Sequence, residues 1–164
     1  MNRRSMICMT AVTVLGFGLS ASTADSAPKG QVNKRQLVGS WTIVSVDGYG
    51  PNPKGSLIFE ANGRFSLQLV SSDIPKYLSN GRIQGTPAEY KATVEGSLSY
   101  FGTYSVSGSE LTFHVEGCSF PNWTGTDQKR INLSVTGDEL KYTNPAPSAG
   151  AGAPVLPLVW KRVK

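Results

Sequence analysis

The sequence predicts an all-β fold, an antiparallel up-and-down β-barrel of eight strands, or up to ten, with one short α-helix between the third and fourth strands. Two observations predict it. Beyond residue 35, short runs rich in Val, Ile, Thr, Phe and Tyr alternate with glycine-containing turns. Those turns are short enough to join neighbouring antiparallel strands, and closing the resulting meander removes the exposed edges that promote aggregation.

Eight runs fit strands, at residues 41–46, 56–61, 64–71, 100–106, 110–117, 128–136, 139–143 and 155–163. The clearest turn is Asn62-Gly63, because both central positions of a type I′ turn need positive φ, which Asn and Gly adopt at least cost. Gly108 and Gly137-Asp138 mark two more tight turns. Consecutive strands are therefore expected to be neighbours in the sheet.

A capping box predicts the start of the helix. The Thr86 hydroxyl can accept a hydrogen bond from the Glu89 amide, and the Glu89 carboxylate can reach back, with Pro87 in the first turn. Beyond it, apolar side chains recur every four residues at 90, 94 and 98. We expect this face to cover one end or side of the barrel, with Lys91 and Glu95 paired towards water.

The first 24 residues have the pattern of a signal peptide. Arg3 and Arg4 precede an apolar run at residues 6–19, and small residues follow at 20–24. We expect cleavage after Ala24 and export to the periplasm or the medium; a twin-arginine route is the less favoured alternative, because the residues around the arginine pair match that signal poorly. A linker at residues 25–34 and a domain at residues 35–164 complete the predicted organisation.

Removing this leader changes the charge and the cysteine count. The full chain carries a net charge of +5, and without Arg3 and Arg4 the remaining 14 basic and 11 acidic residues leave about +3. The charge is mild and the basic residues are scattered, so we expect no nucleic-acid partner. Cys8 departs with the leader, so Cys118 has no partner for an intrachain disulfide. We expect no stable membrane span in the mature protein, and its oligomeric state is left open.

The stretch from His114 to Arg130 contains the most varied side chains of the chain. Folded as a hairpin about Trp123, its strands have one apolar and one polar face. The expected pairs are Leu111 with Val135, Phe113 with Leu133 and Val115 with Ile131 on the apolar face, and Thr112 with Ser134, His114 with Asn132 and Glu116 with Arg130 on the polar face. Alternation does not say which face points inward.

Two interpretations of this hairpin follow. The usual sidedness of antiparallel sheets puts the apolar face in the core and leaves His114, Glu116 and Arg130 in solvent. The inverted arrangement lines the cavity with these three residues, where His114 could act as an acid, a base or a hydrogen-bond anchor. The loop at residues 119–127 carries Phe120 and Trp123, and it is expected either to plug one end of the barrel or to form a hydrophobic rim at its entrance.

Other chemistry is disfavoured by residue counts. One histidine excludes a multi-histidine metal site, and a zinc site with a single histidine normally needs more cysteine than Cys118 supplies, so no metal or other cofactor is expected. A nucleophilic pair of Cys118 and His114 is disfavoured, since four residues along a strand span about 13 Å.

Several segments together resemble a known family. Leu37-Val38-Gly39-Ser40-Trp41 resembles the Gly-x-Trp opening of lipocalins, and Leu158-Val159-Trp160-Lys161-Arg162 resembles their last strand. Phe65 to Leu69, Tyr100 to Tyr104 and His114 to Asp127 are similar, in this order, to the bacterial and fungal lipocalin-like domain family.

The resemblance implies a calycin-type barrel with an internal cavity, in which Gly39, Trp41 and Arg162 are structural and the arginine packs across the tryptophan. The chain departs from ordinary lipocalins in two ways. It leaves no room for their C-terminal helix, and it places the capped helix between the third and fourth strands. The shape of the cavity mouth is therefore not carried over from that family.

The leading functional prediction is an exported protein that binds a small, hydrophobic or amphipathic molecule inside the barrel. The residues assigned to the ligand are Gln68, Tyr104, His114, Glu116, Trp123 and Arg130. One alternative is an isomerase or cyclase that uses His114 and Glu116 for proton transfer. A second is a protein-interaction module that uses the loop from Phe120 to Trp123.

Overall fold

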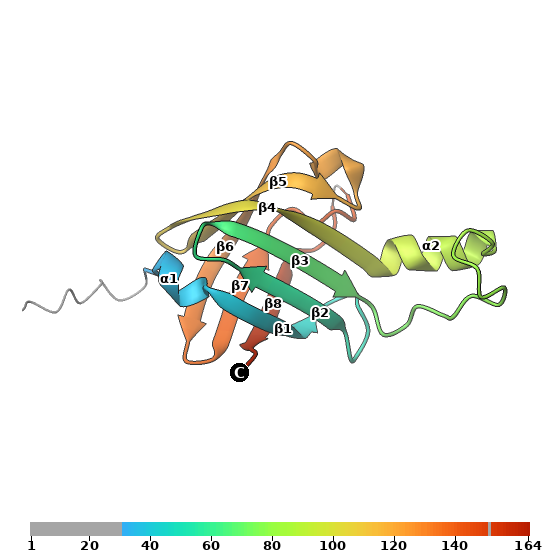
Figure 1. The fold of residues 1–164 in the computed structure, drawn as a ribbon, viewed down its shortest axis with the longest axis horizontal. Helices are drawn as coiled ribbons and strands as arrows, with labels where there is room; N and C mark the ends of the chain where they lie inside the picture. Colours follow the sequence, from blue (N-terminus) through green and yellow to red (C-terminus); the bar gives the residue numbers. More distant parts are fainter. Residues whose placement is uncertain (1–30, 151) are drawn as a thin grey trace, which may run out of the picture.

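The computed structural model describes residues 31–150 and 152–164, and it is a closed barrel of eight antiparallel strands in sequence order (Figure 1). This confirms the predicted fold class. The elements are α1 (Lys34–Leu37), β1 (Gly39–Val46), β2 (Lys54–Phe59), β3 (Arg64–Val70), α2 (Pro87–Gly96), β4 (Ser97–Ser107), β5 (Glu110–Cys118), the 3-10 turn η1 (Pro121–Trp123), β6 (Asp127–Thr136), β7 (Glu139–Asn144) and β8 (Leu156–Arg162). The predicted leader, its cleavage site and most of the predicted linker lie outside the described residues.

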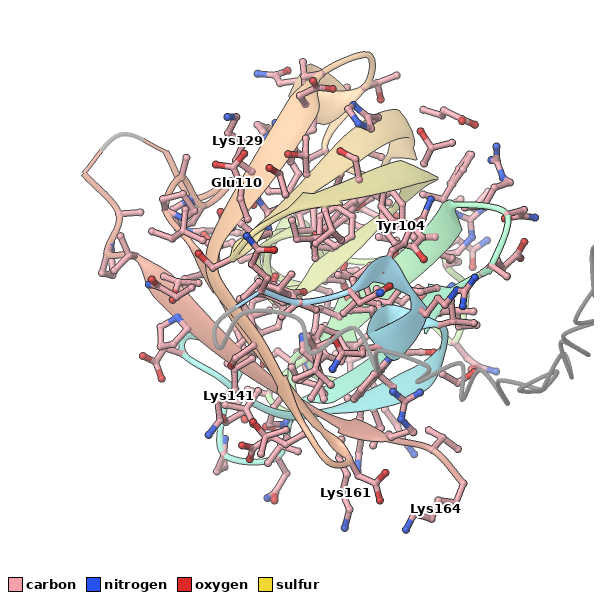
Figure 2. All side chains as sticks on the ribbon, turned by 90° about the vertical axis from the view of Figure 1, so that its left-hand side faces the viewer. Tyr104, Glu110, Lys129, Lys141, Lys161 and Lys164 are labelled. Carbon is pink, nitrogen blue, oxygen red and sulfur yellow. The ribbon has the colours of Figure 1, made fainter. Side chains whose placement is uncertain are left out.

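One end of the barrel is formed by short connections. The β2–β3, β4–β5 and β6–β7 turns lie at this end, and α1 lies across it. Figure 2 looks onto this end, with Tyr104 beside α1 and Lys141, Lys161 and Lys164 along one edge. The α1 helix is held here by Leu37, which is fully buried. We call this the closed end.

The closed end is packed around Trp41. Its indole N–H donates to the Leu37 carbonyl at 2.8 Å, and the Arg162 guanidinium lies 4.1 Å from its ring centre. Arg162 also donates to the carbonyls of Val38 and Gln36 at 2.8 and 2.7 Å, so it ties the last strand to the segment that leads into the first. Gly39 leaves room for this arginine, because a Cβ there would lie 2.9 Å from its Nη1. The contact that the family resemblance implied between Arg162 and Trp41 is present.

Three strands change their side-chain alternation along their length. Each contains one residue more than the partner strand beside it, between Ile43 and Ser45 in β1, between Val115 and Gly117 in β5, and between Ile131 and Ser134 in β6. An extra residue of this kind is a β-bulge, and it turns the residues beyond it onto the opposite face. Because of these bulges, a count of alternating residues from one end of these strands gives the wrong face at the other end.

The helix α2 begins at the predicted capping box. The Thr86 hydroxyl accepts from the Glu89 amide, and Glu89 accepts in return from the Thr86 amide at 2.6 Å. The Leu78 amide is a second donor, at 2.8 Å, and these two backbone hydrogen bonds lower the pKa of Glu89. The box also anchors the long β3–β4 loop, through Leu78.

The expectation that this helix covers the barrel is wrong except at its last turn, where Val94 and Glu95 lie at the end of the barrel. Figure 1 shows α2 projecting beyond the barrel, and Val94 is 76% exposed. The helix packs instead on the preceding loop, where the Tyr77 ring meets the Tyr90 ring edge-on at 5.7 Å. The third residue of the expected face, Leu98, is buried in β4, because the chain is already extended at Ser97.

Candidate functional site

The end of the barrel opposite α1 contains a cavity of about 620 Å³. The four connections β1–β2, β3–β4, β5–β6 and β7–β8 meet at this end, and all contribute to its lining. Its apolar wall is formed by Val46, Leu69, Leu98, Phe120, Leu156 and Leu158. The volume lies within the range of known small-molecule sites. The barrel is therefore packed with side chains at the closed end and has a cavity at the opposite end.

The most deeply buried polar side chains of this wall are Tyr100, Arg130 and Asn144. Arg130 is 2% exposed and donates through Nη2 to the Tyr100 hydroxyl at 3.3 Å and through Nη1 to the Lys129 carbonyl at 2.7 Å. Its guanidinium carbon lies 5.5 Å from the ring centre of Phe113 and 5.4 Å from that of Trp123. These aromatic rings hold the cation in place from the side of the core.

The tyrosines near the cavity keep their protons at neutral pH. Burial raises the pKa of Tyr100, although the Arg130 guanidinium opposes the rise, and burial also raises the pKa of the half-buried Tyr49 at the β1–β2 loop. Tyr142 lies below the cavity wall, and burial together with Tyr100 raises its pKa further. The Trp160 indole N–H is close enough to oppose this rise, but the two groups do not complete a hydrogen bond. Tyr49 and Tyr100 can therefore act as O–H donors to an oxygen in the cavity.

The predicted pairing of β5 with β6 is wrong. The structure pairs Leu111 with Arg130 and His114 with Asp127, where alternation predicted Val135 and Asn132. Leu111 and Arg130 are buried opposite each other, and the bulge that follows in β6, at Asn132 with a φ of +56°, changes the side-chain alternation before Leu133. As a result Arg130 points inward while Ile131, expected in the core, is on the outer face.

The apolar face of β5 is in the core, as usual sidedness predicts. Phe113 and Val115 are buried, and Leu133 of β6 is buried with them. The inverted arrangement is therefore wrong for His114 and Glu116, both of which lie on the outer surface. Of the three residues that it placed in the cavity, only Arg130 is there.

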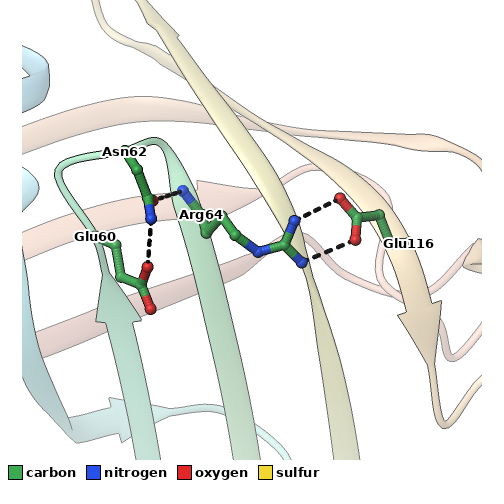
Figure 3. A network of polar contacts seen from close by, with 4 residues as sticks. All are labelled: Glu60, Asn62, Arg64 and Glu116. Carbon is green, nitrogen blue, oxygen red and sulfur yellow. Dashed lines mark hydrogen bonds and ion pairs between the residues drawn. The ribbon is translucent and has the colours of Figure 1, made fainter.

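Glu116 is engaged outside the barrel by Arg64. Figure 3 shows the guanidinium of Arg64 facing both carboxylate oxygens, with Nη1 to Oε1 at 3.1 Å and Nη2 to Oε2 at 2.8 Å. The Asn62 side chain beside it accepts from the Arg64 amide and donates to Glu60, which secures the β2–β3 turn. The hydrogen bonds from Arg64 lower the pKa of Glu116. This carboxylate has no access to the cavity.

This ion pair predicts a pH-dependent effect of Glu116→Gln. The folded pKa is below the ordinary value of 4.5, so the contribution of the carboxylate to stability is present above that value and is lost as the pH falls through the folded pKa. We expect the variant to have a slightly lower Tm than the parent at neutral pH and the same Tm once the pH is below the folded pKa. Thermal unfolding of both proteins across this range tests it; a Tm difference that does not change with pH would contradict it.

His114 makes a polar chain across three strands of the outer face. Its Nδ1 lies 2.6 Å from Oδ1 of Asp127, and its Nε2 lies 3.2 Å from the Ser105 hydroxyl. This is the order of groups in a hydrolytic triad. However, the His114 and Asp127 side chains are 43% and 61% exposed, and none of the three residues lines the cavity. These three side chains join β4, β5 and β6 on the outer face, away from the cavity at the end opposite α1.

The remaining predicted ligand residues lie in three different places. Gln68 is exposed on the outer face of β3, so its expected place in the cavity is wrong. Tyr104 is inside the barrel but at the closed end, where its hydroxyl donates to the Glu60 carbonyl and Lys34 lies over its ring. Trp123 is 7% exposed and packs edge-on against Tyr100, behind Arg130. The loop at residues 119–127 neither simply plugs the barrel nor simply forms a rim at its entrance, because Trp123 is part of the core while Phe120 lines the cavity.

The polar residues of the cavity that sequence reasoning missed include Tyr49, Tyr100 and Asn144. Tyr100 stands in one of the segments that resemble the lipocalin-like family, and this was the available signal. Asn144 is the last residue of β7, and its Oδ1 accepts from the Ala146 amide. Tyr49 lies in a loop, where periodicity carries no information about direction.

Other site types find no support among the residues that the structure describes. No group of three or more His, Cys, Asp or Glu side chains in residues 31–150 and 152–164 is arranged to hold a metal ion. In the same residues, neither helix has the length and apolar character needed to cross a membrane. Cys118 is a free thiol, and burial raises its pKa.

Comparison with known proteins agrees with this architecture. The model of the lipocalin-like domain family matches residues 38–163. The chain belongs to the lipocalin-like domain family. The match spans all eight strands of the lipocalin-like barrel, from Gly39 of β1 to Arg162 of β8.

A curated relative of this lipocalin-like chain is the 4'-hydroxy-3'-methoxypropiophenone carrier protein of Aspergillus oryzae, 26% identical over 107 residues that cover 60% of this chain and 96% of the relative. Solved structures include a lipocalin-like protein from Bacteroides uniformis, with 13% identity, coverage of 78% and 99%, and a TM-score of 0.43. The fluorescent protein UnaG also matches, with 10% identity, coverage of 79% and 98%, and a TM-score of 0.37.

Proposed function

We propose that this lipocalin-like protein is an exported carrier that holds a small, partly hydrophobic molecule in the cavity at the end of the barrel opposite α1. The observation that carries the proposal is the hollow of about 620 Å³, lined by aliphatic side chains with a few buried polar groups. The relative from Aspergillus oryzae supports it, because its name describes a carrier of an aromatic ketone. Export is supported by the leader pattern of residues 1–24.

The two alternative functions lose the features on which they depended. The enzyme hypothesis needed His114 and Glu116 around a sequestered substrate, and both side chains lie on the outer face. The interaction hypothesis needed an exposed loop over a filled barrel. Trp123 is buried, Phe120 is half-buried, and the barrel has a cavity. Ligand carriage is the function that the geometry supports best.

Blocking the cavity tests the proposal. Leu156 lines the cavity and is partly buried, so the larger ring of Leu156→Trp should occupy space that a ligand needs. We expect this change to weaken binding of the neutral fluorophore N-phenylnaphthylamine by about tenfold or more. Fluorescence titration of the purified protein measures the effect. Native mass spectrometry of protein from its own host should in addition reveal a co-purifying small molecule.

The neighbouring residue supplies a matched control. Val155 is 56% exposed and does not line the cavity, so Val155→Trp adds the same ring outside it. The control should bind the fluorophore as the parent does. Equal titrations for the parent and both variants would place the fluorophore elsewhere, and absence of binding to the parent together with a clean apo mass would refute the carrier function.

A further inference from the structure

We propose that the ligand carries an acidic oxygen group, a carboxylate or sulfonate, on its apolar body, and that Arg130 holds this group at the inner wall of the cavity. The proposal rests on the carrier function and specifies its ligand class. Arg130 is the one buried basic side chain among residues 31–150 and 152–164, and it lines the cavity. A buried positive charge in a cavity wall is costly unless another group pairs with it.

No carboxylate within the described part of the chain neutralises this arginine. None of the ion pairs found there includes Arg130. The acidic residues of the cavity lining, Asp47 and Glu95, are both exposed, and Glu95 pairs with Lys91 at 3.8 Å. A buried charge without a counter-ion costs several kcal/mol of desolvation, so a protein retains one chiefly where another group pairs with it.

The guanidinium also has unused hydrogen-bonding capacity. An arginine side chain has five N–H donors, and two of them are engaged in the described structure, by the Lys129 carbonyl and the Tyr100 hydroxyl. The guanidinium fork matches the two oxygens of an acidic group better than any other side chain does. The donors left free therefore suit a ligand oxyanion.

The surroundings favour an oxyanion over a neutral group. The Tyr100 hydroxyl accepts from Arg130, which leaves its own proton free to donate, and Tyr49 lines the same cavity. Phe113 and Trp123 pack against the guanidinium and keep it from turning into the core. The aliphatic side chains of the wall, Leu69, Leu98, Leu156 and Leu158 among them, fit an apolar body attached to the acidic group.

Two fluorophores with the same ring system test this inference. Anilinonaphthalenesulfonate carries an acidic group, and N-phenylnaphthylamine is the same scaffold without it. We expect the parent protein to bind the sulfonate about tenfold more tightly, or more, and Arg130→Met to abolish this preference while keeping its affinity for the neutral probe. Because the site is buried, the preference should persist at about 1 M salt, where exposed charges are screened beyond about 3 Å.

Arg130→Met should fold, since replacing a buried charge by an apolar side chain of similar length is often neutral or stabilising. We expect its Tm to equal or exceed that of the parent. Arg130→Gln is the second variant, because it keeps a hydrogen-bond donor without the charge, and it should lose the preference as well. Lys129→Met is the matched control, since it removes an exposed cation that pairs with Glu110 outside the barrel, and it should keep the preference.

The outcomes separate the two proposals. If the neutral probe binds but the parent shows no preference for the sulfonate, or if Arg130→Met and Arg130→Gln keep that preference, the acidic-ligand inference is overturned and the carrier function stands. If both probes are lost equally and the Tm falls in both Arg130 variants, the arginine is a structural brace, and the inference is also overturned. If the parent binds neither probe and yields a clean apo mass, the carrier function itself fails.

Discussion

Replacing Trp41 with alanine is expected to lower the free energy of unfolding by about 3–5 kcal/mol, the largest loss that we expect for a truncation in this barrel. The indole is fully buried, its N–H is bonded to the Leu37 carbonyl, and Arg162 packs over its ring. The change would leave a cavity at the closed end and remove the surface on which Arg162 rests. Chemical denaturation monitored by circular dichroism measures the loss.

Trp41→Ala should affect stability without affecting the choice of ligand. Trp41 lies at the end opposite the ligand cavity and does not line it, so the preference between the two naphthalene probes should stay unchanged wherever the variant is folded. Val44→Ala is the control in the same strand, since Val44 is 52% exposed, and a change of within about 0.5 kcal/mol is expected. A loss at Trp41 no larger than that of the control would disprove its structural role.

Gly102→Ala is expected to cost at least about 3 kcal/mol, at the upper end of overpacking effects. Gly102 is buried in β4 beside the bulge of β5, where the β5 backbone comes closest to it. A Cβ there would collide with the His114 carbonyl oxygen and would lie 2.9 Å from the Glu116 nitrogen. Backbone atoms of a paired strand cannot move aside as a flexible side chain can. Urea denaturation and the dispersion of amide NMR signals would report loss of the β4–β5 pairing.

Gly125→Ala distinguishes this steric effect from the cost of backbone conformation. Gly125 has a φ of +78° and no atom within 4 Å of a built Cβ, so the control adds strain without a collision. We expect it to cost about 1–2 kcal/mol. An equal or smaller loss for Gly102→Ala would show that the bulge can relax, and that the register of β4 with β5 does not depend on this glycine.

The bulge of β6 explains why Arg130 alone of the three polar hairpin residues faces the cavity. His114 and Glu116 were correctly assigned to one face of β5, and they share the outer face. Arg130 was assigned to that same face by counting alternate residues through β6, and the extra residue near Asn132 reversed the count. A bulge depends on contacts with the neighbouring strand. The sequence of the strand that contains it therefore does not show where the alternation changes face.

The sequence by itself determined the number and order of the strands, the tight turns between them, the capping box of α2 and the family. All of these depend on interactions between residues close together along the chain, or on segments that can be compared one at a time. Only the tertiary structure decided which side chains face the cavity and where α2 packs. Both depend on residues brought together from distant strands and loops, such as Tyr100 of β4 and Arg130 of β6, whose hydrogen bond exists only when the barrel is closed.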